Sequence, residues 1–211
     1  MTRYQTLLVE NKAPTLIVGG ARDALCSRDD QEALLTAMSR ILRPEVAMRP
    51  IINIADVEFA REIRHGDDFE ARIAPVGVHL GARKLGYNIT VVPPGKRAFP
   101  FHNHHTNEEM FLILDGNGTL RFGKDEYPVK KGDLVACPPG GPEVAHLLIN
   151  SGETELRYLA LSTTLDTDVF QYPDSGKFGV VSGRLPGTSQ SEAPFNGFFV
   201  EDTRVDYWQG E

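Results

Sequence analysis

The segment FHNHHTNEEMFLILDG, residues 101–116, concentrates imidazole and carboxylate side chains ahead of an apolar run. Successive side chains of a β-strand point to opposite faces, so His102 and His104 are predicted to project together while His105 turns away. Glu109 opens the apolar run, from which its carboxylate can approach the histidine pair. Imidazole nitrogens and a carboxylate oxygen form a donor set that suits a divalent transition metal. The segment therefore indicates a metal site on a strand, against the alternative of a solvated polar loop.

A further histidine, His146, stands inside the apolar run VAHLLIN. On a strand its side chain shares one face with Leu148 and Asn150. A single histidine on an apolar strand is typically a core residue whose polar atoms have partners within the protein. Because three other potential ligands belong to the same small β-rich region, we interpret His146 as a further metal ligand instead.

Short segments with β-strand character surround these residues, and turn sequences such as DGNG, GKDE and KKGD separate them. Strands at near-regular spacing, with no helical pattern between them, predict a mainly β fold, an antiparallel sandwich or barrel. The predicted strands are Arg72–Ala74, Val76–Leu80, Gly86–Val92, Met110–Leu114, Thr119–Phe122, Tyr127–Lys130, Leu134–Cys137, Val144–Ile149 and Glu155–Ser162.

The N-terminal part of the chain has a different pattern. The segment SRDDQEALLTAMSRIL, residues 27–42, combines a capping serine, an acidic first turn and an apolar stripe, which together predict a helix. The nearby IVGGAR lacks the length and spacing of a phosphate-binding loop. We therefore expect an N-terminal extension with one helix over residues 1–49, a β-barrel over residues 50–165, and a C-terminal tail over residues 166–211 that packs on the barrel.

Composition excludes several classes of protein. The chain has 211 residues, a net charge of −7, and two cysteines, Cys26 and Cys137, in unlike contexts. The acidic balance disfavours nucleic acid or an anionic membrane as partner, because both require clustered basic surface. No apolar run approaches the roughly 20 residues that span a bilayer, and neither a secretory signal nor a disulfide framework is indicated. We expect a cytoplasmic protein.

Two longer motifs include the candidate ligands. The segment from Gly95 to Gly116 resembles the first conserved motif of the cupin superfamily, G-x5-H-x-H-x3,4-E-x6-G, and the segment from Gly132 to Asn150 resembles the second, G-x5-P-x-G-x2-H-x3-N. The first begins one residue early, and the second has five residues in place of two before its histidine. The matching positions are His102, His104, Glu109 and Gly116 in the first motif, and Gly132, Pro138, Gly140, His146 and Asn150 in the second.

The resemblance implies a small antiparallel jelly-roll barrel with one divalent metal inside it. The ligands implied are His102, His104, Glu109 and His146, with Glu108 as the alternative carboxylate. Such a ligand set suits Zn, Mn, Fe, Ni or Cu, and leaves metal positions open for water or substrate.

The expected activity also follows from the resemblance. The segments PPGKRAFPFHNHH, ACPPGGPE and YPDSGKFG are similar to small single-domain cupins described as sugar-phosphate isomerase-like. An isomerase moves a proton between carbons, and Glu108, Tyr158 and His105 are the candidate bases. Lys96 and Arg97 are candidate phosphate ligands, against the alternative of a solvated turn. An Fe or Ni dioxygenase and a non-catalytic module that binds a small ligand are the rival expectations.

The strand MFLIL, residues 110–114, is apolar at every position, so both of its faces are predicted to be covered. We expect a homodimer that acts on a small-molecule substrate. Met48 is predicted to begin the barrel domain, and residues 1–47 are expected to be either a dispensable extension or the product of an upstream start codon.

Overall fold

The computed structural model describes residues 4–7, 16–19, 50–183, 192–203 and 205–211. The chain divides into two units, Met1–Ala47 and Met48–Glu211. In the first unit, β1 (Tyr4–Leu7) pairs with β2 (Leu16–Gly19) in antiparallel fashion. The helix predicted over residues 27–42 lies outside the described residues. No helix among the described residues is long and apolar enough to cross a membrane.

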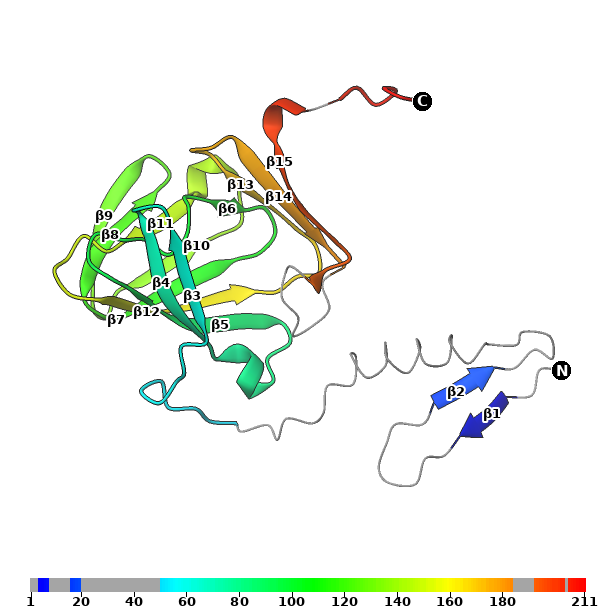
Figure 1. The fold of residues 1–211 in the computed structure, drawn as a ribbon, viewed down its shortest axis with the longest axis horizontal. Coiled ribbons are helices and arrows are strands. Elements are labelled where there is room, and N and C mark those ends of the chain that lie inside the picture. Colours follow the sequence, from blue (N-terminus) through cyan, green and yellow to red (C-terminus); the bar gives the residue numbers. More distant parts are fainter. Residues whose placement is uncertain (1–3, 8–15, 20–49, 184–191, 204) are drawn as a thin grey trace. The chain divides into compact units, whose positions relative to one another are not determined.

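Two antiparallel sheets form the body of the second unit (Figure 1). The larger has the strand order β10-β7-β12-β5-β4-β3, and the smaller has the order β11-β8-β9. The strands of the larger sheet are β3 (Arg61–His65), β4 (Phe69–Pro75), β5 (Leu85–Val92), β7 (Glu109–Asp115), β10 (Leu134–Cys137) and β12 (Leu156–Thr163). Those of the smaller sheet are β8 (Asn117–Phe122), β9 (Asp125–Lys130) and β11 (His146–Ile149). The mainly β prediction is confirmed.

The main hydrophobic core brings together one face of each sheet. It combines Phe111 and Ile113 from β7 with Leu120 from β8 and Leu148 from β11, and Cys137 lies in the same cluster. On the other face of β7, Leu114 joins a second cluster with Ile52, Phe59 and Leu80, among others. Both faces of the MFLIL strand are thus covered by the chain itself, as predicted.

The Asp-Gly turn after β7 depends on Gly116. Its φ is 81°, in the left-handed region that residues with a side chain rarely adopt. A Cβ atom added there would lie 2.4 Å from the carbonyl oxygen of Glu155. The motif glycine is therefore required both by the backbone conformation and by the close approach of β12.

Two sequence predictions in this region are corrected. The segment Val76–Leu80, predicted as a strand, contains the 3₁₀ helix η1 (Gly77–Leu80), which ends at Gly81 with a φ of 73°. Its apolar alternation did not reflect a buried face, since Val78 is 50% exposed. Strand β3 was missed because its sequence, REIRH, is polar or charged at every position except Ile63. The short helices η2 (Pro142–Val144) and η4 (Glu201–Thr203) complete the fold.

The C-terminal segment, expected as a tail without assigned strands, forms a third sheet of the unit. Strands β13 (Asp168–Tyr172), β14 (Lys177–Ser182) and β15 (Phe195–Val200) join β6 (Asn103–His104) in the order β15-β14-β13-β6. In this sheet β13 pairs directly with β6, and Phe170 lies opposite His104. The segment therefore forms part of the wall around the histidine strand.

Candidate metal centre

Three strands present the predicted ligands. His102 and His104 flank Asn103 at β6, Glu109 begins β7, and His146 begins β11. His102 and His146 are antiparallel partners, because each backbone N–H donates to the other residue's carbonyl oxygen, at 3.2 and 2.8 Å. Strand pairing thus brings together two histidines that lie far apart in the sequence.

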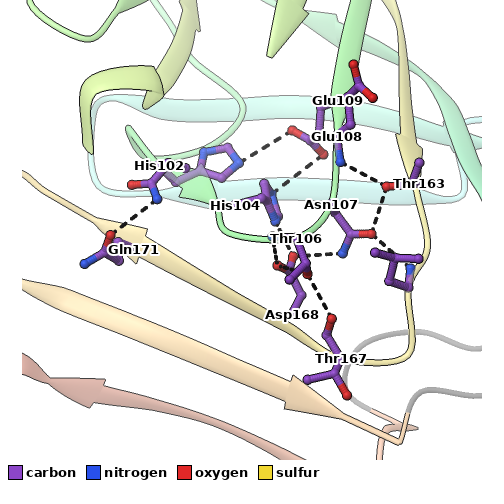
Figure 2. Close-up of polar contacts among 12 residues, drawn as sticks. His102, His104, Thr106, Asn107, Glu108, Glu109, Thr163, Thr167, Asp168 and Gln171 are labelled. Carbon is purple, nitrogen blue, oxygen red and sulfur yellow. Dashed lines mark hydrogen bonds and ion pairs between the residues drawn. The ribbon is translucent and has the colours of Figure 1, made fainter. Parts of the chain in front are cut away.

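The imidazoles converge on the carboxylate of Glu109. The Nε2 atom of His146 lies 3.1 Å from Glu109 Oε2, and His102 Nε2 lies 3.8 Å from the same oxygen. On the other oxygen, His104 Nε2 lies 3.8 Å from Oε1 (Figure 2). Ligand atoms of His102, Glu109 and His146 all lie within 4.8 Å of one another. His102, Glu109 and His146 thus form one compact set of candidate ligand atoms, and His104 adds a third imidazole beside the other oxygen of the carboxylate.

The opposite ring nitrogen of each histidine has a hydrogen-bond acceptor. His102 Nδ1 lies 2.8 Å from the carbonyl oxygen of Pro100, and His146 Nδ1 lies 3.3 Å from that of Val144. His104 Nδ1 lies 2.6 Å from Asp168 Oδ2. At His102 and His104 these acceptors favour a proton on Nδ1, which leaves the lone pair of Nε2 free to bind a metal, whereas His146 Nε2 is at hydrogen-bond distance from the Glu109 carboxylate.

The charges of the site suit a cation. Burial, with the neighbouring His146, lowers the pKa of His102 to about 4. Burial by itself raises the pKa of Glu109, but the hydrogen bond with His146 and the charge of His104 outweigh it and hold the pKa at about 2. The resulting neutral His102 imidazole and ionised carboxylate are the protonation states that a metal requires of its ligands.

The donor set therefore fits a divalent transition metal. Cys137, the thiol close to the site in sequence, is buried in the core cluster, and burial raises its pKa further above its usual range. A thiol in that environment behaves as a small apolar residue, as the sequence predicted. Three imidazoles with one carboxylate are the donors in reach of the site among the described residues.

The candidate bases lie apart from the convergence point of the imidazoles. Glu108 is exposed, its N–H donates to Thr163 Oγ1 at 2.9 Å, and its carboxylate points away from the histidines (Figure 2). His105 is exposed and its Nε2 lies 2.9 Å from Gln171 Oε1. Tyr158 is buried in the core against Phe111, and burial raises the pKa of its phenol. Their predicted role in proton transfer stays a prediction.

The candidate phosphate ligands have other partners. Lys96 Nζ donates to the carbonyl oxygen of Asp67. Arg97 forms an ion pair with Asp68 at 2.7 Å and lies over the ring of Phe69. Both cations are therefore used in holding the loop before β4, which favours the alternative interpretation of these residues as part of a turn.

Sequence reasoning missed the contribution of β13. Asp168 is fully buried beside His104, and Tyr172 stacks on His102 with ring centroids 6.1 Å apart. Burial raises the pKa of Tyr172 to about 12, and the charge of Glu109 adds to the shift. In DVFQY the acid and the two aromatic residues stand at alternate positions and share one face, which was the signal for a strand that the sequence offered. Nothing local in that segment indicates that its acid faces a histidine.

Comparison with known proteins identifies the domain. Residues 88–162 match the cupin domain family. The chain contains a cupin domain. The match spans all four predicted ligands and confirms the resemblance found in the sequence. Asp168 and the C-terminal strands lie beyond the matched residues, so the cupin pattern itself does not include them.

Two curated relatives match part of the chain. An uncharacterized protein of Methanocaldococcus jannaschii is 36% identical over 72 residues, and an oxalate-binding protein of Thermotoga maritima is 31% identical over 70 residues. The alignments include 34% and 33% of this chain and 54% of each relative. The chain therefore matches about half the length of these relatives.

Two solved structures share more of the chain than the cupin domain alone. A proposed sugar phosphate isomerase from Acidithiobacillus ferrooxidans is 26% identical, with a TM-score of 0.63, over 75% of this chain and 97% of that protein. A protein of Silicibacter pomeroyi described as a sugar phosphate isomerase of the cupin superfamily is 19% identical, with a TM-score of 0.61, over 73% and 94% of the two chains. The second likeness shows a common fold alone.

Proposed function

We propose that the protein is a metal-dependent enzyme of the sugar-phosphate isomerase-like cupins, with one divalent transition metal held by His102, His104, Glu109 and His146. The observation that carries the proposal is the convergence of three Nε2 atoms on the Glu109 carboxylate. The metal ligation fits the buried, neutral state of His102 and the ionised state of Glu109. The likeness to the A. ferrooxidans protein over 97% of its length supports the substrate class.

A bound metal of this kind polarises a carbonyl and orients a neighbouring hydroxyl. The protein's own side chains hold and shape the site. Tyr172 and Phe170 form an aromatic wall against His102 and His104, with centroid distances of 6.1 and 5.9 Å. The side chains of His102, His104 and Glu109 are 11% to 20% exposed, so a small ligand can reach them.

A second candidate function is the binding of a small dicarboxylate without turnover. It is supported by the oxalate-binding relative and by the position of the candidate bases, since Glu108 and His105 lie outside the imidazole cluster. A carboxylate ligand needs the metal alone, whereas an isomerase also needs a group that moves a proton.

Two assays on metal-reconstituted protein separate the candidates. The first follows aldose–ketose interconversion on a panel of sugar phosphates, and the second measures oxalate binding by calorimetry. The isomerase proposal predicts turnover that is lost in His146→Asn and retained in His79→Asn, a matched change at an exposed histidine. Oxalate binding without turnover would establish the second function instead. Oxygen uptake with an enol substrate would contradict both and indicate a dioxygenase.

A further inference from the structure

Asp168 is a buried acid that receives four hydrogen-bond donors. Its Oδ2 lies 2.6 Å from His104 Nδ1 and accepts from Asn107 Nδ2 at 2.8 Å. Its Oδ1 accepts from Thr106 N at 3.1 Å and from Thr106 Oγ1 at 2.7 Å. The residue is 0% exposed. A carboxylate without solvent contact persists in a fold when its lone pairs are satisfied in this way.

His104 lies between two acids. Asp168 contacts Nδ1 on one edge of the ring, and Glu109 lies 3.8 Å from Nε2 on the other edge (Figure 2). An ionised carboxylate can only accept, so the hydrogen bond to Asp168 requires a proton on Nδ1. The Nε2 lone pair is then directed to the side of Glu109, where a metal would bind.

The other two imidazoles are fixed differently. The Nδ1 acceptors of His102 and His146 are the backbone carbonyls of Pro100 and Val144. Backbone carbonyls belong to the barrel whatever side chains the loop carries. Among the three histidines, His104 is the one whose Nδ1 acceptor is a side chain, supplied by a segment outside the cupin match.

Strand β13, which carries Asp168, is held to the barrel by contacts other than the one with His104. Its pairing with β6 continues in the hydrogen bond from His105 N to Val169 O at 2.8 Å. Beyond its far end, Asp174 receives two hydrogen bonds from Arg121, at 2.7 and 2.9 Å. Arg121 in turn lies 3.7 Å over the ring of Phe101. The position of Asp168 is therefore supported by contacts that do not involve the imidazole of His104.

We infer that Asp168 is a positioning residue of the metal centre, which holds His104 with Nδ1 protonated and Nε2 presented beside Glu109. The inference rests on the proposed metal site. It makes the C-terminal sheet a component of the centre, because a metal-binding ring depends on a carboxylate that lies beyond the cupin domain match. Removing the hydrogen-bond partner of a ligand histidine typically lowers metal affinity by about 10–100-fold.

The variant that tests the inference is Asp168→Asn in the full chain. An asparagine offers one oxygen and no charge to four donors: either its NH₂ group faces His104 and Asn107 and the hydrogen bond to Nδ1 is lost, or it faces Thr106 and a weaker, neutral acceptor replaces the carboxylate at Nδ1. Asp166→Asn is the matched control, because Asp166 is exposed two residues earlier in the chain. Thr106→Val is the second control: it removes a donor to the same carboxylate and a hydrogen bond to Thr167 O, but leaves the contact with His104 intact.

Affinity for Co²⁺ is measured by competition with a chelator, and the visible spectrum of the bound Co²⁺ reports its coordination. Asp168→Asn should weaken affinity by about 10–100-fold and alter the spectrum. Asp166→Asn and Thr106→Val should keep the wild-type affinity and spectrum, whatever their melting temperatures. Equal losses in Asp168→Asn and Thr106→Val, or wild-type affinity in Asp168→Asn, would overturn the inference.

A second measurement separates this inference from the proposed function. In metal-free protein with ¹⁵N-labelled histidine, the Nδ1–H proton of His104, assigned with a His104→Asn sample, should be protected from exchange and visible. It should disappear or exchange faster in Asp168→Asn, and persist unchanged in Thr106→Val. If the wild-type protein binds no Co²⁺ but shows this proton, the metal proposal fails while the positioning of His104 holds. Absence of the proton in the wild type overturns the positioning role itself.

Discussion

Phe170 lies directly opposite His104 in the pairing of β13 with β6, and their ring centroids are 5.9 Å apart. On the next strand, Gly179 lies opposite Phe170. A Cβ atom added at Gly179 would lie 2.0 Å from the Phe170 ring, far inside any normal contact. The glycine thus provides the space in which the ring packs beside a predicted metal ligand.

Gly179→Ala is expected to displace Phe170 and, through it, His104. Overpacking of this kind typically costs about 1–3 kcal/mol of folding stability. We expect a lower melting temperature together with weaker metal binding. The control is Gly197→Ala on β15, where the added Cβ would come no closer than 3.1 Å to the ring of the exposed Phe199. Wild-type stability and metal affinity in Gly179→Ala would contradict the packing described here.

Metal removal should lower the stability of the cupin domain. A ligand that binds only the folded state at 100 times its Kd adds about 2.7 kcal/mol to the free energy of unfolding. Calorimetric melting with and without a chelator measures the difference. We expect a clear fall in melting temperature for the wild type and no change in Glu109→Gln, which lacks the carboxylate on which the imidazoles converge. An equal response of both proteins would show that the chelator acts elsewhere.

Cys137 should react with thiol reagents only after the domain unfolds. Its side chain is 1% exposed and lies in the core cluster with Phe111 and Val135. In Cys26→Ser protein Cys137 is the remaining thiol. Labelling with a thiol reagent across a denaturant series should follow the unfolding transition measured by circular dichroism. Complete labelling in native buffer would contradict the buried position of Cys137.

The homodimer remains a prediction, and the structure changes the surface that supports it. The second face of MFLIL packs on Ile52 and Phe59 within the chain, so it needs no partner. In the C-terminal sheet, β15 is the end strand and exposes Phe195, Phe198 and Phe199, at 56%, 66% and 41%. Exposed apolar edge strands are typical association sites. Light scattering should give a dimer that Phe198→Lys weakens, and a monomeric wild-type protein would refute the prediction.

The sequence predicted the barrel and the convergence of its ligands because these depend on local rules. Strand parity places His102 and His104 together, and the six-residue step from Glu109 to Gly116 matches a turn that only glycine can form. Strand pairing then delivers His146. The spacing signals are each contained in a few neighbouring residues, the resemblance to the two cupin motifs connects them, and the pairing of His102 with His146 is seen only in the structure.

The parts that sequence reasoning missed depend on contacts between distant segments. Asp168 lies in a segment whose glycines, prolines and polar residues resemble a loop, and its partner His104 is 64 residues away. Strand β13 is short and is stabilised by pairing with β14 and with the two-residue strand β6, which has no pattern of its own. Tertiary context, not local propensity, decides such segments.

The central claim is that His102, His104, Glu109 and His146 hold one metal ion. Anomalous diffraction from crystals of Zn²⁺-loaded protein, collected above and below the zinc edge, tests it directly. The account predicts one strong peak at about 2.0–2.2 Å from the three Nε2 atoms and a Glu109 oxygen. A peak bound to other residues, or no peak among the imidazoles in fully loaded crystals, would contradict the account.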